Sequence, residues 1–101
     1  MLLMTLYTRG AKFERRVRDH YIEQGYLVVR PAQSKGPFDL VALKKGEVLV
    51  IQCKIGGAIS KAEMKRRADL AESVGAKAVF ASRGPAPSYL LKLQSHGRTE
   101  E

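Results

Sequence analysis

The sequence predicts an α/β fold in which a central mixed β-sheet is flanked by helices. Three observations lead to this prediction: two segments carry helix signals, four short segments carry strand signals, and the two kinds alternate along the chain. The order is helix, three strands, helix, strand, which is typical of a sheet with helices on both faces. A length of 101 residues suits one domain, so we expect a single domain over residues 1–101 with an ordered core over about residues 8–94.

The first helix is predicted over residues 10–24. Apolar side chains recur there at helical spacing, namely Phe13, Val17 and Tyr21. Gly25 is a typical helix terminator, and Thr8 is a candidate N-cap. The first helix therefore packs one apolar stripe against the sheet.

Three strands are predicted between the helices. The first covers residues 26–30, and the residue types in 33–37 then favour a loop. Two apolar runs follow, 38–43 and 48–53, and the four residues between them read as a hairpin turn. Because the second run begins with four consecutive apolar residues, we expect a central strand covered on both faces.

The second helix is predicted to begin at a capping box, in which Ser60 is followed three residues later by Glu63. Gly75 ends this helix, and residues 78–81 read as a short buried strand. Residues 88–94 fit either a last strand or a short helix. The polar tail that follows, from residue 95, is expected to fray.

Composition narrows the classes of partner and of metal site. Eighteen Lys and Arg against ten Asp and Glu leave a net charge of +8, which favours a polyanionic partner, nucleic acid first and a membrane surface second. One cysteine excludes an internal disulfide and a Cys-rich zinc site, and two histidines are too few for a multi-histidine site. We find no membrane-spanning run and no signal-peptide pattern, so we expect a cytoplasmic protein.

Polar groups converge at one end of the predicted hairpin. Asp39 begins its first strand, and Gln52 and Lys54 project from one face at the end of its second strand. Carboxylate and amide oxygens, with the backbone carbonyl of Cys53, are ligands that suit Mg²⁺. A metal held there would activate water for phosphodiester hydrolysis, and Lys54 would neutralise charge that develops on the phosphate.

A purely structural role is also open for these groups. An Asp at a strand start can be a turn residue, and a Lys after a strand can be solvated. The basic residues of the second helix fit a solvated face or a stripe along a DNA backbone equally well, namely Lys61, Lys65, Arg66 and Arg67. Asp39, Gln52 and Lys54 together are less easily explained by structure alone.

The sequence also resembles a known family. Gly36-Pro37-Phe38-Asp39 followed by Val50-Ile51-Gln52-Cys53-Lys54 resembles the PD-(D/E)xK nuclease motif. The wider pattern includes GAKFERR at residues 10–16, GYLVVR at 25–30, Ser34-Lys35, DLVA at 39–42 and IQCK at 51–54. Over roughly residues 9–82 it is similar to the archaeal-type Holliday junction resolvases, which are small, basic, dimeric nucleases with a restriction-endonuclease-like fold.

The resemblance implies roles for individual residues. Asp39 matches the central metal ligand, Lys54 the catalytic lysine, and Glu14 an acid of the first helix that joins the metal site. Gln52 stands where the family usually has Glu, which removes one negative charge from the site. The expected catalytic residues are Glu14, Ser34, Asp39, Gln52 and Lys54. The expected metal ligands are Glu14, Asp39, Gln52 and the Cys53 carbonyl.

Several basic residues are expected to contact DNA. The resemblance places Arg15 near the scissile phosphate and gives Arg30, with Ser34, a part in junction binding and cutting. The full expected set is Arg9, Arg15, Arg30, Lys35 and Arg66. Cys53 is expected to be a small core residue, since its side chain faces away from Gln52 and Lys54.

We therefore expect a metal-dependent, structure-selective DNA endonuclease that resolves four-way junctions by paired strand cleavage. The expected cofactor is Mg²⁺, with Mn²⁺ as a substitute, and the expected partners are branched DNA and a second copy of the chain. Apolar residues within 1–6 or 88–93 are candidates for the dimer interface. We expect no membrane partner and no small-molecule cofactor. The alternatives are a flap or nicking repair nuclease, and a non-catalytic DNA-binding module in which Gln52 marks a decayed metal site.

Overall fold

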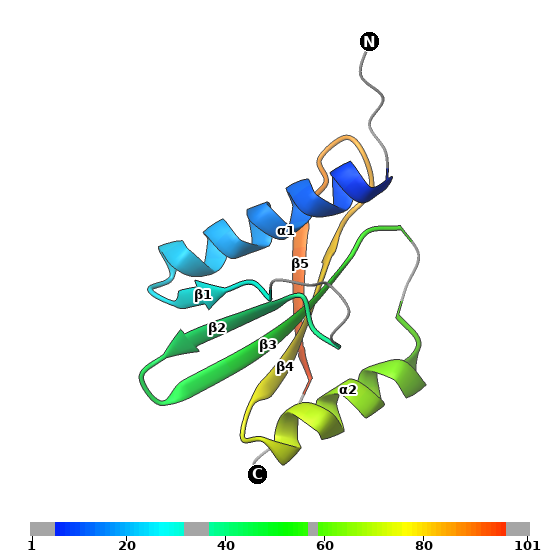
Figure 1. The fold of residues 1–101 in the computed structure, drawn as a ribbon. Coiled ribbons are helices and arrows are strands. Elements are labelled where there is room, and N and C mark those ends of the chain that lie inside the picture. Colours follow the sequence, from blue (N-terminus) through cyan, green and yellow to red (C-terminus); the bar gives the residue numbers. More distant parts are fainter. Residues whose placement is uncertain (1–5, 32–36, 57–58, 97–101) are drawn as a thin grey trace.

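The computed structural model describes residues 6–31, 37–56 and 59–96, and it has two helices and one five-stranded sheet (Figure 1). The elements are α1 (Leu6–Glu23), β1 (Leu27–Val29), β2 (Leu40–Lys44), β3 (Glu47–Lys54), α2 (Lys61–Ser73), β4 (Lys77–Arg83) and β5 (Leu91–His96). The strand order in the sheet is the order in the chain. Only β3 and β4 pair in parallel, so the predicted mixed sheet is confirmed.

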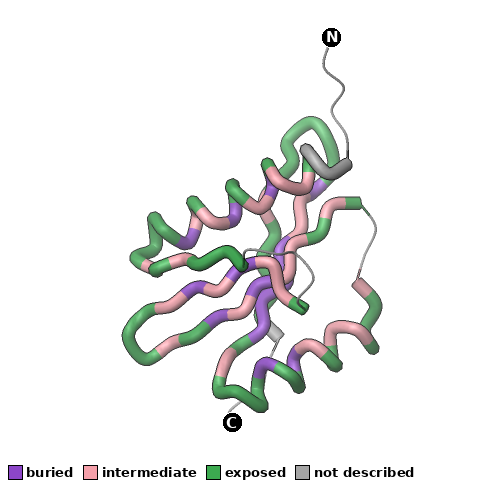
Figure 2. The backbone as a smooth tube through the Cα atoms, in the orientation of Figure 1, coloured by how far each residue is buried: buried purple, intermediate pink, exposed green. Residues whose placement is uncertain are grey.

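The helices cover opposite faces of the sheet (Figures 1 and 2). On one face, the apolar stripe of α1 packs against Leu49 and Ile51 of β3. On the other face, Ala68 and Ala71 of α2 pack with Phe80 of β4. The prediction that β3 is a central, covered strand is confirmed, because its successive side chains enter the two cores alternately.

The first helix begins earlier than predicted. It starts at Leu6, so Thr8 lies inside it and the proposed cap at Thr8 was wrong. The two residues before Thr8 are compatible with a helix and nothing in them interrupts it. At the other end Gly25 has a φ of 95°, a conformation that glycine adopts without steric cost and that ends the helix as predicted.

Ser60 is the N-cap of α2 as predicted, but the Glu63 carboxylate binds arginines and does not close the other half of the predicted capping box. The Ser60 hydroxyl accepts a hydrogen bond from the N–H of Glu63 at 3.1 Å. The carboxylate of Glu63 binds two arginines of the same helix, Arg66 and Arg67. These two side-chain hydrogen bonds lower the pKa of Glu63, so the carboxylate is ionised at neutral pH.

The segment after β4, left open between strand and helix, is the strand β5. Ser95 and His96 pair with Val79 and Ala78 of β4, so the expectation that the chain frays from residue 95 was wrong for these two residues. The rest of the predicted tail, residues 97–101, lies outside the described part of the chain. Backbone pairing satisfies the N–H and C=O groups of polar residues as well as apolar ones, which explains why a polar sequence extends the strand. Within the described part of the chain, no helix has the length and apolar character to span a membrane.

Candidate active site

Asp39 is held against the end of β3 by two hydrogen bonds. Its N–H donates to the carbonyl of Ile51 at 2.8 Å, and its Oδ2 accepts from the N–H of Cys53 at 2.7 Å. The carboxylate therefore continues the β2–β3 ladder beyond Leu40, the first residue of β2. The prediction that Asp39 lies beside this end of β3 is confirmed. Its carboxylate binds Cys53, which lies between Gln52 and Lys54 in the chain.

Gln52 and Lys54 lie on the α2 face of β3, because Val50 two residues earlier packs in the α2 core. Lys54 is exposed and lines a pocket of about 190 Å³ together with Met64 and Ser82. The Oε1 atom of Gln52 is buried and has no hydrogen-bond partner among the residues described. Buried acceptors are nearly always satisfied in folded proteins, so this oxygen is expected to bind a water molecule or a ligand.

Glu14 approaches from the other face of the sheet, on α1. Its Oε1 forms an ion pair with Nε of Arg30 at 3.1 Å. The Glu14 side chain is 19% exposed and that of Arg30 is 56% exposed. With Arg15, both line a small pocket of about 90 Å³ that also touches Leu40, the neighbour of Asp39. Arg30 thus holds the acid of the first helix beside the start of β2.

The thiol of Cys53 lies near both carboxylates. Burial raises the pKa of this thiol, and the negative charges of Asp39 and Glu14 raise it further. The thiol is therefore neutral at physiological pH and is a poor metal ligand, because metals bind the thiolate. This supports the expectation that Cys53 contributes only its backbone.

We expect the folded protein to react with iodoacetamide at pH 8 at least about tenfold more slowly than the urea-unfolded chain, because the thiolate is the reactive form. The raised pKa of Cys53 also makes the free energy of unfolding fall as the pH rises above about 9, since the thiol loses its proton in the unfolded chain before it does so in the folded protein. Mass spectrometry and denaturant titrations measure the two effects. Cys53→Ala is the control and should reduce the pH dependence; equal alkylation rates in the two states would contradict the shift.

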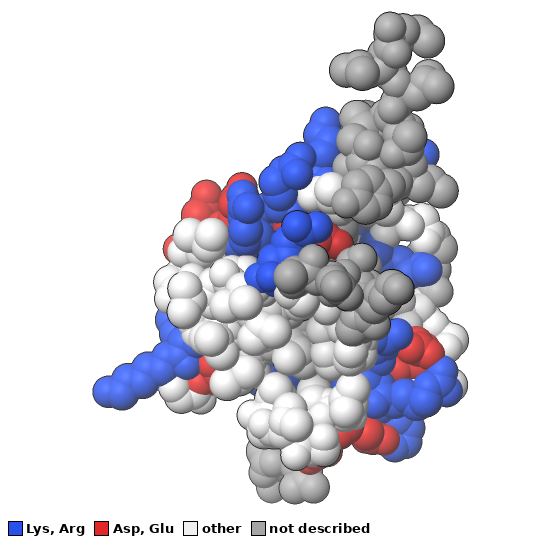
Figure 3. Space-filling view, in the orientation of Figure 1, with Lys and Arg blue, Asp and Glu red and all other residues white. Residues whose placement is uncertain are grey.

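The expected DNA-contacting residues do not form one continuous group. Arg15 and Arg30 lie beside Glu14, whereas Arg66 is on α2 and binds Glu63. Arg9 is exposed near the start of α1. Figure 3 shows basic side chains gathered over α1 and, separately, over α2. The predicted roles of Ser34 and Lys35 concern residues that lie outside the described part of the chain.

Arg67 makes a contact near Asp39 that the sequence alone did not reveal. Its Nη1 atom donates to the carbonyl of Pro37, two residues before Asp39. Its Nε atom also binds the Glu63 carboxylate at 2.7 Å. The spacing of Glu63 and Arg67 by four residues indicates the helical pair, but no sequence signal indicates the contact with Pro37. Arg67 thereby ties α2 to the segment that carries Asp39.

The oxygen atoms at the end of β3 fit a hard divalent cation. They comprise the carboxylate of Asp39, the unpartnered Oε1 of Gln52 and the backbone carbonyl of Cys53. Among the described residues there is no cluster of three His, Cys, Asp or Glu side chains, so this donor set has little negative charge. Glu14 would add a second carboxylate after it leaves Arg30.

The sequence model of the archaeal Holliday junction resolvase family, Hjc, matches residues 5–101. The chain belongs to this family. The crossover junction endodeoxyribonuclease Hjc of Methanocaldococcus jannaschii is 35% identical over 79 residues, which are 74% of this chain. The chain spans 59% of the length of that relative.

Solved structures agree with the membership of the Hjc family. Hjc of Archaeoglobus fulgidus, described as a Holliday junction resolvase from an archaeal hyperthermophile, superposes with a TM-score of 0.66 and 25% identity. The alignment covers 84% of this chain and 75% of that one. The bacterial homing endonuclease I-Ssp6803I has a TM-score of 0.60 at 13% identity, covering 96% and 78%, which shows the shared fold alone. The predicted restriction-endonuclease-like fold is confirmed.

Proposed function

We propose that this protein is a metal-dependent, structure-selective DNA endonuclease that resolves four-way junctions by paired strand cleavage. It would act in DNA recombination and repair. The observation that carries the proposal is the carboxylate of Asp39 bound to the Cys53 N–H, between Gln52 and Lys54, in a chain of the Hjc family. The net charge of +8 supports a nucleic-acid substrate.

The proposed cofactor is Mg²⁺, with Mn²⁺ as a substitute. Asp39, Gln52 and the Cys53 carbonyl would hold it, and Glu14 would join them. When bound, such a metal lowers the pKa of a water molecule and offsets negative charge on the phosphate. The hydrogen bond from Cys53 engages Oδ2 of Asp39 and restrains the carboxylate, so Oδ1 would be the oxygen offered to the metal.

Lys54 and Arg30 have separate tasks in this proposal. Lys54 is exposed, so its ammonium can reach a phosphate and neutralise charge that develops there. Arg30 is more exposed than its partner Glu14, and a DNA phosphate would compete with Glu14 for the guanidinium. Loss of that ion pair would free the Glu14 carboxylate for the metal. DNA binding and completion of the site would then be coupled.

The deciding experiment is cleavage of a labelled four-way DNA junction with Mg²⁺, with Mn²⁺ and with EDTA. The proposal expects paired nicks on opposite strands of the junction, only with metal, and little cutting of linear duplex. Preferred cutting of flaps or nicked duplexes would favour the repair-nuclease alternative. Tight junction binding without any cutting would favour the non-catalytic module.

We expect affinity for the junction to fall steeply with salt, because Lys and Arg contacts to phosphates release condensed counterions. The slope of log affinity against log salt should be roughly −0.9 for each phosphate contacted. Fluorescence anisotropy in EDTA, from low to moderate KCl, measures the slope. The preference for the junction over linear duplex should persist wherever both bind measurably. A flat salt response would point to a different partner.

We propose a two-fold homodimer, because a four-way junction needs two opposed cuts and each chain carries one candidate site. Of the two predicted interface segments, residues 1–5 lie outside the described residues. The other includes Leu90, which precedes β5 and is 64% exposed, and Leu93, which lies on β5 and is 37% exposed. β5 is an edge strand of the sheet. Exposed apolar side chains on an edge strand favour pairing with another chain.

The dimer is expected in light scattering as twice the chain mass of 11.2 kDa at micromolar concentration. Leu93→Glu should shift the protein toward the monomer, because a charge would be buried in the interface. Leu70→Glu, at an exposed apolar residue of α2, is the matched control. A strict monomer, with and without the junction, would contradict the dimer. If Leu93→Glu leaves the dimer intact, the dimer interface does not include Leu93.

A further inference from the structure

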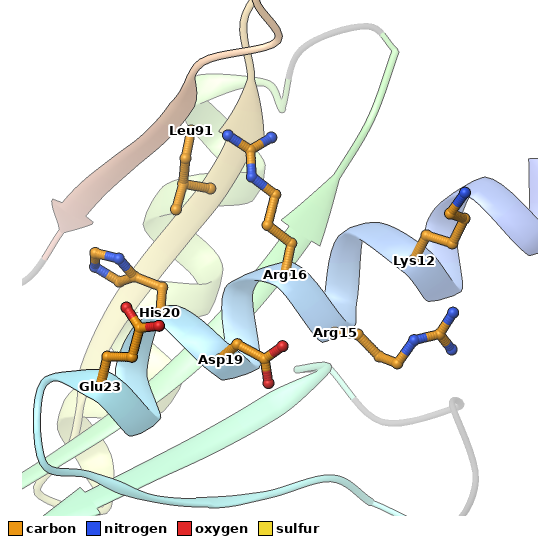
Figure 4. Close-up of a pocket in the computed structure, with 7 residues that line it drawn as sticks. All are labelled: Lys12, Arg15, Arg16, Asp19, His20, Glu23 and Leu91. Atoms are coloured by element: carbon orange, nitrogen blue, oxygen red, sulfur yellow. The ribbon is translucent and has the colours of Figure 1, made fainter.

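A basic pocket of about 370 Å³ lies between the first half of α1 and the end of β4. Its lining residues are Arg9, Lys12, Phe13, Arg16, Arg83 and Tyr89. Four of these six side chains are cationic at neutral pH and none is acidic. The pocket adjoins the site shown in Figure 4, which shares Lys12 and Arg16 but contains two acids toward the end of the helix, Asp19 and Glu23.

The positive charges of this pocket are not neutralised within the described part of the protein. Arg9, Lys12 and Arg83 form no ion pair with a described residue, and Arg16 donates to a neutral carbonyl, that of Tyr89, at 2.7 Å. Like charges gathered in one pocket repel one another, so an anion that binds there relieves the repulsion.

The loop that carries Tyr89 at the edge of the pocket is supported by three hydrogen bonds. The N–H of Gly84 donates to Leu90 O at 2.6 Å, and the N–H of Tyr89 donates to Pro85 O at 3.1 Å. Tyr89 has a φ of 48°, which bulky residues rarely adopt, so these contacts and that of Arg16 determine its position. The Arg83 guanidinium lies 4.6 Å from the centre of the Tyr89 ring. These contacts hold Tyr89 against Arg16 and Arg83 at the wall of the pocket.

The pocket and the candidate active site lie on opposite flanks of α1. Arg9, Lys12 and Arg16 recur at helical spacing on the flank toward Tyr89. Glu14 and Arg18 lie on the flank toward Arg30. A helix with its side chains is about 10 Å wide, so a ligand at Glu14 does not fill the basic pocket.

We propose that this pocket binds a backbone phosphate of DNA at a second contact, separate from the phosphate at the candidate active site. One arginine guanidinium can bind two phosphate oxygens at once. Three arginines line this pocket, two from α1 and one from β4. The pocket is larger than one phosphate, and the exposed ring of Tyr89 offers a surface to the adjoining sugar or base. The choice of DNA as the source of the phosphate rests on the proposed function.

The test compares two double variants that each remove two positive charges. Arg9→Gln/Lys12→Gln alters the pocket, and both side chains lack protein partners among the described residues. Lys45→Gln/Lys77→Gln is the control, at exposed lysines of the β2–β3 turn and the start of β4. Anisotropy of a labelled four-way junction and a linear duplex, in EDTA over a range of KCl, gives the salt slope. We expect the pocket variant to reduce the magnitude of the slope by about 1, the value for one lost phosphate contact, and the control to leave it unchanged.

A second measurement locates the ligand. In protein carrying ¹³C-labelled tyrosine, the ring signals of Tyr89 should shift during titration with duplex DNA, while those of the buried Tyr21 stay in place. Inorganic phosphate is titrated separately. Equal salt slopes in the two double variants, or Tyr89 signals that respond to inorganic phosphate and not to DNA, would overturn the inference.

Junction cleavage by the unchanged protein is scored in parallel, so the inference and the proposed function fail separately. If the unchanged protein cleaves the junction but the two salt slopes do not differ, the proposed function is supported and the phosphate contact at the pocket is contradicted. If the slopes differ but the unchanged protein does not cleave the junction, the pocket is supported as a DNA contact and the proposed nuclease activity is contradicted.

Discussion

Asp39→Asn is expected to reduce the rate of junction cleavage by at least about 10²-fold, while junction binding stays the same or becomes stronger. The Asn side chain keeps an oxygen that can accept the hydrogen bond from Cys53, so the end of β3 keeps its local structure. What the substitution removes is the negative charge of the proposed metal ligand. Loss of a negative charge near a phosphate favours DNA binding.

Lys54→Ala is expected to reduce cleavage to a similar extent, because it removes the cation that would meet the developing charge. Asp69→Asn is the matched control for Asp39→Asn, since Asp69 is an exposed acid of α2 whose one ion pair among the described residues is with Lys65, across one helical turn. Cleavage kinetics on a labelled junction and anisotropy in EDTA measure the two properties for each variant. Full cleavage by Asp39→Asn or Lys54→Ala would remove the nuclease assignment, whereas loss of binding in both would point to misfolding.

Gln52→Ala is expected to lose most of the cleavage activity, and Gln52→Glu is expected to keep or raise activity at low metal concentration. Gln52 presents a buried oxygen with no partner among the described residues, and an amide oxygen can occupy a ligand position without adding charge. The site then depends on the scissile phosphate for part of its negative charge. The metal requirement should lie in the millimolar range, or Mn²⁺ should be more effective than Mg²⁺.

Metal titrations of cleavage and calorimetric titration of Mn²⁺ without DNA test this expectation independently. Gln52→Glu should tighten Mn²⁺ binding, because it restores a carboxylate. Gln24→Ala is the control, at an exposed Gln that follows α1. If Gln52→Ala cuts junctions as fast as the unchanged protein across the titration, Gln52 is a structural residue of β3. The site would then rest on Glu14, Asp39 and Lys54.

Local sequence signals predicted most of the elements. The apolar spacing in α1, the Ser60–Glu63 cap of α2 and the turn between β2 and β3 each involve residues within a few positions of one another. The hairpin also predicted that Asp39 meets the end of β3, since a short turn leaves little choice of register. Asp39, Gln52 and Lys54 could therefore be identified as candidate site residues from the sequence alone.

The sequence alone determined the class of fold, the hairpin and the polar groups at its open end, because each depends on periodicity or turn chemistry over a short span. Only the tertiary structure decided that β5 is a strand, that Arg30 holds Glu14 and that Arg67 reaches Pro37. It also assembled the basic pocket, in which Arg16 and Tyr89 are 73 residues apart. Such contacts depend on how α1, α2 and the sheet pack together, and the residues next to each position in the sequence do not indicate which distant residue it will contact.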